Sequence, residues 1–296
     1  MTAYDPGKWR SHLFDLEGSM VREILVRVSV CLAWSIVVTG LYEHGPGLFD
    51  KLAIAPTAHM MIGPALGLLL VFRTNSSYDR FWEGRKQWGG IVNETRNLAR
   101  QAETWLAADR ELADRCIRWT IAFAFATMHR LHAGDGIGLA RRGLPADEVL
   151  AAEQSGHVPL AVARKLTALM HDAQRRGLID AMQLRSLDLN VQALIDCCGA
   201  CERIQSTPAP FGYVVHLRRA LIIYCLTLPL ALVRDYGWGA VLATLAISYV
   251  LFGIEEIGVE IEHPFDLTIN DLPLERICDT IDRDLNGLLG AGNTPS

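Results

Sequence analysis

The sequence lacks the short motifs that mark common enzyme classes. No GxSxG, HExxH or Walker pattern occurs along the chain, so we expect a protein that is not an enzyme. The alternation of apolar and polar residues that marks β-strands is also absent, which predicts an all-α fold. The first twenty residues are polar, so no cleavable signal peptide is expected. Neither a cofactor nor a nucleic-acid partner is expected.

The seven cysteines lack the pattern of a disulfide framework. Two lie in apolar blocks and five lie in segments expected in the reducing cytoplasm. Cys197 and Cys201 share one helical face, as a pair of zinc ligands would. No histidine lies nearby in sequence, and a structural zinc site usually has four ligands, so we predict helix packing by small residues instead.

Unbroken hydrophobic runs of full membrane-spanning length are lacking as well. Apolar residues concentrate in four blocks of about 14 to 16 residues, against roughly 20 for a full span. About 145 polar, periodic residues separate the second block from the third. A buried hairpin in a soluble bundle is therefore one alternative, but the distribution favours two membrane hairpins around a soluble insert. The blocks are Val28–Tyr42, His59–Phe72, Ala220–Val233 and Gly239–Ile254.

The flanks of the blocks favour the membrane. Arginines at three edges can extend to lipid headgroups, and aromatic residues at the opposite edges can anchor in the interface. These are Arg27, Arg73 and Arg219, and Tyr42, Tyr236 and Trp238. Basic residues crowd the same side of all four blocks, whereas the other side has only Lys51 and Arg234. The positive-inside rule then places both termini and the insert in the cytoplasm, and the protein in the inner membrane.

Helical periodicity organises the rest of the chain. Three stretches of the insert, Cys116–Leu131, Val162–Met170 and Met182–Ile204, predict helices, and an apolar stripe continues from the second block through Ile91, Leu98, Ala102 and Trp105. We therefore divide the chain into residues 1–72, with spans at about 24–42 and 57–72, a cytoplasmic region at 73–217, a second hairpin at 218–255, and a cytoplasmic C-terminal segment at 256–296.

Four segments of the chain carry a recognisable pattern. They are Trp9-Arg10-Ser11-His12-Leu13-Phe14, the junction from Phe72 to Arg85, the segment from Cys198 to Leu217, and Ile261-Glu262-His263-Pro264-Phe265 with Asn270-Asp271-Leu272-Pro273-Leu274. These segments resemble the bestrophin family of ion channels, in its prokaryotic branch. They occur in the family's order over nearly the whole chain. The resemblance implies a homopentamer in the lipid bilayer, in which the second membrane helix lines a central pore for inorganic ions.

The resemblance also implies two constrictions. Counting back from Arg80-Phe81-Trp82 places the pore neck at Pro64, Leu68 and Phe72, where Pro64 departs from the usual bulky aliphatic residue. Stacked apolar rings can gate by dewetting. Without the resemblance, these residues would be interpreted as facing lipid or neighbouring helices. Counting back from Cys198 places a cytoplasmic aperture near Met182.

Acidic residues give weaker signals. Animal bestrophins bind calcium through an acidic run after the Asn-Pro-Phe-like motif, but Thr268 interrupts that run here, which leaves Asp271 as the candidate and makes calcium binding and other metal sites unexpected. A further acidic group closes the fourth block and is expected to be a solvated helix end that pairs with Arg218 or Arg219. It comprises Glu255, Glu256, Glu260 and Glu262.

The neck carries no charge, so it does not fix ion selectivity. Glu43 and Asp50 near the outer mouth, with a net charge of −5, favour cations such as sodium or potassium. An anion channel for chloride with the same architecture is the alternative. A secondary transporter would be expected to show internal repeats and midplane ionisable residues, which we do not find, and a non-conducting membrane scaffold is the alternative from another class.

Overall fold

The computed structural model describes residues 20–44, 54–134 and 136–289. Every regular element in these ranges is helical, which confirms the predicted all-α fold. The elements are α2 (Val21–His44), α3 (Pro56–Trp105), α4 (Arg110–Leu131), η3 (Gly138–Arg141), α5 (Ala146–Glu153), α6 (Val158–Arg175), α7 (Ala181–Ser206), α8 (Phe211–Tyr236), α9 (Gly239–Glu260) and α10 (Leu274–Asn286).

Four helices, α2, α3, α8 and α9, are long and apolar enough to cross a membrane. Each contains one predicted apolar block and extends beyond it. The helix lengths run from 22 residues in α9 to 50 residues in α3. Each therefore exceeds the roughly 20 residues that a bilayer requires. The blocks are short in sequence because charged residues at their ends belong to the same helices.

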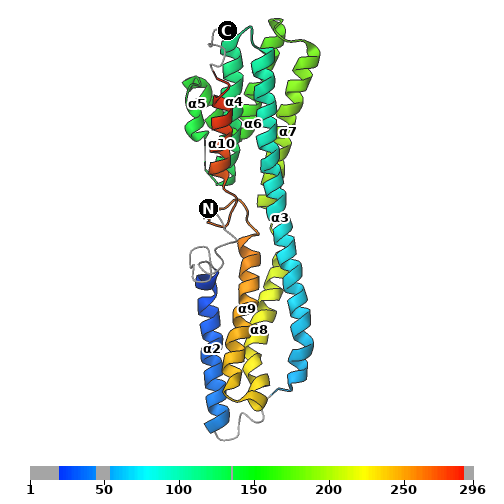
Figure 1. Cartoon of the computed structure of the whole chain (residues 1–296), viewed down its shortest axis with the longest axis vertical. Coiled ribbons are helices and arrows are strands. Elements are labelled where there is room, and N and C mark those ends of the chain that lie inside the picture. The colour runs from blue at the N-terminus through cyan, green and yellow to red at the C-terminus, as the bar shows by residue number, and fades with distance from the viewer. Residues whose placement is uncertain (1–19, 45–53, 135, 290–296) are drawn as a thin grey trace. The chain divides into compact units, whose positions relative to one another are not determined.

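The chain divides into two compact units, and the first comprises Met1–Phe81 and Pro208–His263. In it α2, α8 and α9 lie against one another, and the first part of α3 joins the same core (Figure 1). The core is made of Ile24, Val28, Cys31, Leu66, Leu70, Leu217, Leu221, Cys225 and Phe252. The first unit thus brings all four candidate spans together.

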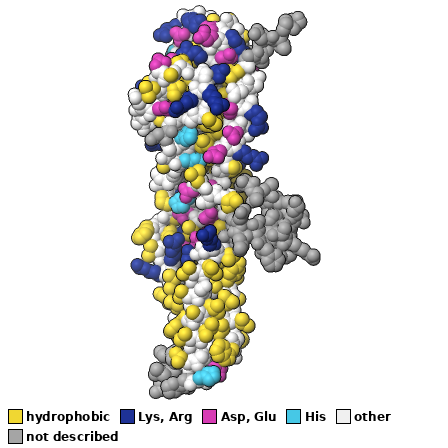
Figure 2. Space-filling model, turned by 90° about the vertical axis from the view of Figure 1, so that its left-hand side faces the viewer, with side chains coloured by type: hydrophobic (Ala, Val, Ile, Leu, Met, Phe, Trp, Pro, Cys, Tyr) yellow, Lys and Arg dark blue, Asp and Glu magenta, His cyan; other side chains and the backbone are white. Residues whose placement is uncertain are grey.

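The outer surface of the first unit is apolar. Hydrophobic side chains cover most of its visible face in Figure 2, and Val26, Met61 and Leu242 each expose at least 70% of their surface. In the most apolar window of each span, no more than 33% of the residues are buried. Water would disfavour such a surface, whereas lipid matches it, so the first unit fits a membrane protein rather than a soluble bundle.

The second unit comprises Trp82–Thr207 and Pro264–Ser296. Its centre is α4, which packs against α6, α7, α10 and η3 and buries Trp119 and Phe123 completely. The later part of α3 contributes Ile91, Leu98 and Ala102 to the buried side chains, as the predicted stripe requires. An ordinary soluble core of helices therefore forms this unit.

Local signals begin and end the helices where expected. Asp180 and Gln183 form a reciprocal capping box at the start of α7, which satisfies two backbone donors that the helix cannot use. Gly237 has φ 50° in the turn between α8 and α9, a backbone conformation that other residues adopt at a cost. Pro64 and Pro229 lie inside α3 and α8, where each removes one helical hydrogen bond.

Two glycines of α3 allow close contacts within the second unit. A Cβ atom at Gly84 would lie 2.9 Å from Cζ of Phe265, and one at Gly90 would lie 2.8 Å from Sγ of Cys197. Both distances are shorter than real contacts, so neither position accepts a larger residue without movement. The contact at Gly90 agrees with the predicted packing role of Cys197.

Candidate functional site

The helix α3 carries the predicted neck residues Pro64, Leu68 and Phe72 on one face. Their spacing of four residues aligns them along the helix. All three are exposed in the single chain, and Leu68 and Phe72 expose 55% and 58% of their surface. This face of α3 is a row of apolar side chains that no other described part of the chain covers.

The opposite face of α3 holds the helix in the first unit. Leu66 and Leu70 are 3% and 1% exposed and pack into the core with α2, α8 and α9. An offset of two residues is about 200° around a helix, so Leu70 lies opposite to Leu68. The hydroxyl of Tyr213 on α8 also donates a hydrogen bond of 2.9 Å to the backbone carbonyl of Leu69. These contacts on one side of α3 leave the predicted neck residues on the other side, pointing away from the core.

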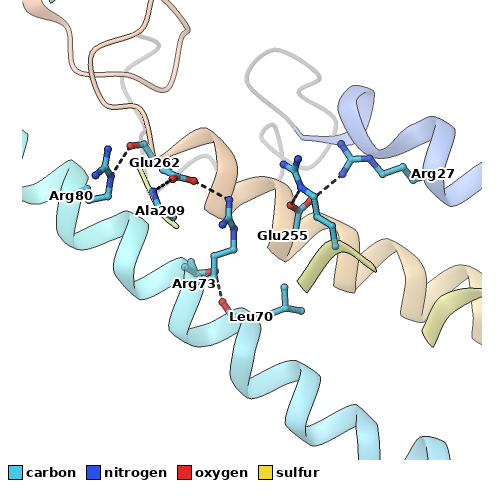
Figure 3. A network of polar contacts seen from close by, with 9 residues as sticks. Arg27, Leu70, Arg73, Arg80, Ala209, Glu255 and Glu262 are labelled. Carbon is cyan, nitrogen blue, oxygen red and sulfur yellow. Dashed lines mark hydrogen bonds and ion pairs between the residues drawn. The ribbon is translucent and has the colours of Figure 1, made fainter. Parts of the chain in front are cut away.

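An ion pair directly follows the predicted neck residues on α3. Nη2 of Arg73 donates to Oε2 of Glu262 at 2.9 Å, and the two side chains are only 3% and 7% exposed (Figure 3). The backbone N–H of Ala209 donates to Oε1 of Glu262 at 2.7 Å, and Nε of Arg80 donates to the Glu262 carbonyl oxygen at 3.1 Å. The expectation that Arg73 extends to lipid headgroups is wrong, because its charge is paired inside the unit.

A second charged cluster joins α2, α8 and α9. Oε1 of Glu255 accepts from Nε of Arg218 at 2.8 Å, and Oε2 accepts from Nη1 of Arg27 at 3.1 Å (Figure 3). Nη2 of Arg27 lies 2.7 Å from Oε2 of Glu256. The predicted pairing with Arg218 is confirmed. The prediction of a solvated helix end is wrong for Glu255, Glu256 and Glu262, which are all buried, because arginines from other helices neutralise them.

The ion pairs of Arg27 and Arg73 were not predicted, although the sequence contains a signal for them. Basic residues mark the same membrane side of the predicted spans at which the acidic group ends α9. Helix ends on one membrane side lie close together in a bundle, so opposite charges there can pair. The buried His59 was not predicted either; its Nε2 lies 3.0 Å from Oγ1 of Thr227, and its ring centre lies 5.1 Å from that of Tyr224.

Among the other predicted channel residues, Met182 and Glu43 are exposed. Met182 lies in the first turn of α7 and exposes 74% of its surface, and α7 runs without interruption from there to Cys198, as the count of residues assumed. Glu43 is exposed near the end of α2, and its Oε1 would lie 3.0 Å from a Cβ at Gly237. Asp50 lies outside the described residues. The roles of Met182, Glu43 and Asp50 stay predictions.

The described residues contain no group of three or more His, Cys, Asp or Glu side chains that could hold a metal ion. Asp271 is buried, and its Oδ2 accepts a hydrogen bond of 2.6 Å from the backbone N–H of Thr268. The carboxylate thus closes a local turn. Cys197 and Cys201 lie one turn apart on α7, and burial raises the pKa of both thiols, so the metal-binding thiolate is disfavoured.

Comparison with known proteins gives concordant findings. The sequence model of the bacterial and fungal bestrophin proteins matches residues 1–287. A voltage-dependent anion channel-forming protein from Nostoc sp. is 38% identical over 289 residues, which cover 95% of this chain and 91% of that protein. A protein of the same description from Synechocystis sp. is 36% identical over 288 residues, which cover 96% and 92%. A crystal structure of a bacterial bestrophin homolog from Klebsiella pneumoniae has a TM-score of 0.85 and 28% identity, and the match covers 90% of this chain and 99% of that chain.

Proposed function

This chain belongs to the bacterial and fungal bestrophin family and is an ion channel of the bestrophin type, and from this premise we propose that five copies form a passive pore in the bacterial inner membrane. The family assignment confirms the resemblance that the motifs suggested, and the relatives are described as channel-forming proteins rather than enzymes. In the proposed topology both termini and residues 73–217 and 256–296 lie in the cytoplasm, on the side where basic residues crowd.

The observation that carries this proposal is the uncovered apolar face of α3. Leu68 and Phe72 point away from the core that Leu66 and Leu70 enter, so assembly around an axis on that side would stack apolar rings. A narrow apolar constriction excludes water and ions, and a small widening readmits them, so such rings can gate a pore without any charge. Pro64 would add a third, less bulky ring.

The permeant ion is proposed to be a small monovalent anion. The relatives from Nostoc and Synechocystis are described as anion channel-forming proteins, which favours the anion alternative over the cation selectivity expected from the sequence. The basic residues on the proposed cytoplasmic side would raise the local anion concentration there. The second candidate is a cation pore, which the exposed carboxylate of Glu43 favours.

The cytoplasmic aperture is proposed at Met182. Its side chain is exposed at the start of α7 and is flexible, so a ring of such residues would form a soft constriction. Calcium is not part of the proposed gating, because Thr268 interrupts the acidic run that binds it in animal bestrophins.

Recordings from the purified protein in a planar bilayer test the function and the selectivity together. Under a KCl gradient, the proposed anion pore should reverse near the chloride equilibrium potential. A reversal near the potassium value would overturn the anion assignment and support the role of Glu43. Absence of current from the wild-type protein and from Phe72→Ala would overturn the channel itself. Native mass spectrometry in detergent should show a pentamer, and a predominant monomer or dimer would contradict the pore.

A further inference from the structure

Glu262 joins three separate segments of the first unit. Its carboxylate accepts from Arg73 of α3 and from the backbone N–H of Ala209, which precedes α8, and its own carbonyl accepts from Arg80, about two turns further along α3 (Figure 3). The residue itself follows the end of α9. One side chain thereby links the pore helix proposed above to the ends of two other membrane helices.

The link is buried but incompletely satisfied. Arg73 contacts Glu262 through Nη2 only, and its Nε and Nη1 have no hydrogen-bond partner among the described residues. A Cβ at Gly258 would lie 3.7 Å from Cγ and Nε of Arg73, so the stem of the arginine lies against α9. A buried charge pair that is joined by one hydrogen bond is held less strongly than a fully hydrogen-bonded pair, so it breaks at a lower cost. Between Arg73 and Glu262, α3 is thus held to the chain that follows α9 by a single charged hydrogen bond.

The position of the pair relative to the neck is the informative feature. Arg73 directly follows Phe72, and consecutive residues of an α-helix are separated by about 100° around the axis. Rotation of α3 at this level would therefore move the side chains of Phe72 and Arg73 together. A charge pair 2.9 Å long cannot follow a large rotation without breaking, whereas apolar packing on Leu70 can slide.

We propose that Arg73 and Glu262 are positioning residues of the gate, which set the rotation of α3 and thereby hold Phe72 in the neck. This inference rests on the proposed channel. The pair holds the narrow arrangement, because its loss would release α3 from the ends of α8 and α9. Opening of the neck then includes a weakening of this contact, and anything that neutralises either charge favours the open pore.

The test is a set of channel recordings on charge-removing variants. Glu262→Gln keeps the shape and an acceptor for Ala209 but removes the charge, and Arg73→Met keeps most of the length. Each variant should raise the open probability by about fivefold or more, the lower end of typical coupling between sites. The double variant removes both buried charges, so it should fold at least as well as either single variant and should add little to the larger single effect.

A matched control separates gating from loss of charge. Glu83→Gln breaks the exposed pair with Arg203 in the second unit, which joins Glu83 Oε1 to Arg203 Nη2 at 3.2 Å, and should leave the open probability unchanged. In a Phe72→Ala background, Glu262→Gln should no longer change the open probability, because the proposed effect of Glu262 on the pore depends on the side chain of Phe72. A purely structural role would lower thermal stability in both backgrounds and leave the open probability unchanged.

The outcomes distinguish this inference from the channel proposal. If the wild-type protein conducts and Glu262→Gln changes only its stability, the positioning role is wrong and the channel stands. If Glu262→Gln changes the open probability by the same factor in the wild-type and Phe72→Ala backgrounds, the pair does not act through Phe72. If neither the wild-type protein nor Phe72→Ala conducts, both proposals are overturned.

Discussion

Substitutions at Leu70 and Phe72 should separate stability from conduction on a single helix. The two residues are two positions apart on α3, yet Leu70 is 1% exposed in the core and Phe72 is 58% exposed on the predicted neck face. Both are large and apolar, so alanine removes several carbon atoms from each. Only the surroundings of the removed atoms differ.

The magnitudes follow from these surroundings. Leu70→Ala leaves a cavity among four helices, and such changes cost about 2 to 5 kcal/mol. At about 2 to 4 °C for each kcal/mol, its midpoint of thermal unfolding should fall by roughly 4 °C or more. Phe72→Ala removes a side chain that touches little of its own chain, so the folding of the unit should change by about 0.5 kcal/mol or less. Its effect should appear in the pore, as a larger current.

Thermal unfolding in detergent, followed by tryptophan fluorescence, measures the first effect, and ion flux from liposomes measures the second. The same purified protein serves both assays. The reasoning would be refuted if Phe72→Ala lost as much stability as Leu70→Ala while the flux stayed at the wild-type rate. That result would place Phe72 in a packed interface instead of in the neck.

Three further predictions concern the second unit. Gly84→Ala should unfold at a lower temperature than Gly89→Ala by the equivalent of about 1 to 3 kcal/mol, because both gain helix propensity but only the first collides with Phe265; equal midpoints would contradict this. A hydrogen bond from the backbone N–H of Leu112, in the first turn of α4, lowers the pKa of the Asp109 carboxyl. The ionised carboxylate therefore stabilises the folded protein fully above the usual pKa of about 4, and this stabilisation is lost as the pH falls through the lower pKa of the folded state. Asp109→Ala should therefore cost about 1 kcal/mol at neutral pH, with a difference from wild type that shrinks in acid; a difference independent of pH would argue against the cap. Burial raises the pKa of Cys198 to about 11, so iodoacetamide at pH 8 should leave this thiol unmodified in the folded protein, and rapid alkylation detected by mass spectrometry would contradict its burial.

Local pattern was sufficient to predict the long helices of the fold, but not the short elements η3 and α5 or the helix α10. The helix at Cys116–Leu131 lies within α4, and Met182–Ile204 lies within α7, because apolar periodicity and capping residues act over a few turns. The four apolar blocks likewise predict α2, α3, α8 and α9, but the blocks are shorter than these helices, because the charged residues that bound the blocks lie inside the helices. Apolar composition therefore predicts the central part of each membrane helix but not its charged ends.

The charge pairs were not predictable in the same way. Arg73 and Glu262 are separated by 189 positions in sequence, and Arg27 and Glu255 by 228. An arginine at the edge of an apolar block has the same local sequence whether it meets a headgroup or a glutamate. The choice between the two is made by the packing of distant helices, and periodicity carries no information on that packing.

The long separation of these partners also has a consequence for synthesis. A ribosome makes Arg27 and Arg73 well before Glu255 and Glu262, and at about 5 to 20 residues per second the 228 positions between Arg27 and Glu255 take roughly 10 to 45 seconds. During that interval α2 and α3 are present with arginines whose partners do not yet exist. The arginines of α2 and α3 gain their glutamate partners only when the end of α9 has been synthesised. A nascent chain that is truncated before that point carries unpaired charges, which a quality-control protease or chaperone can recognise.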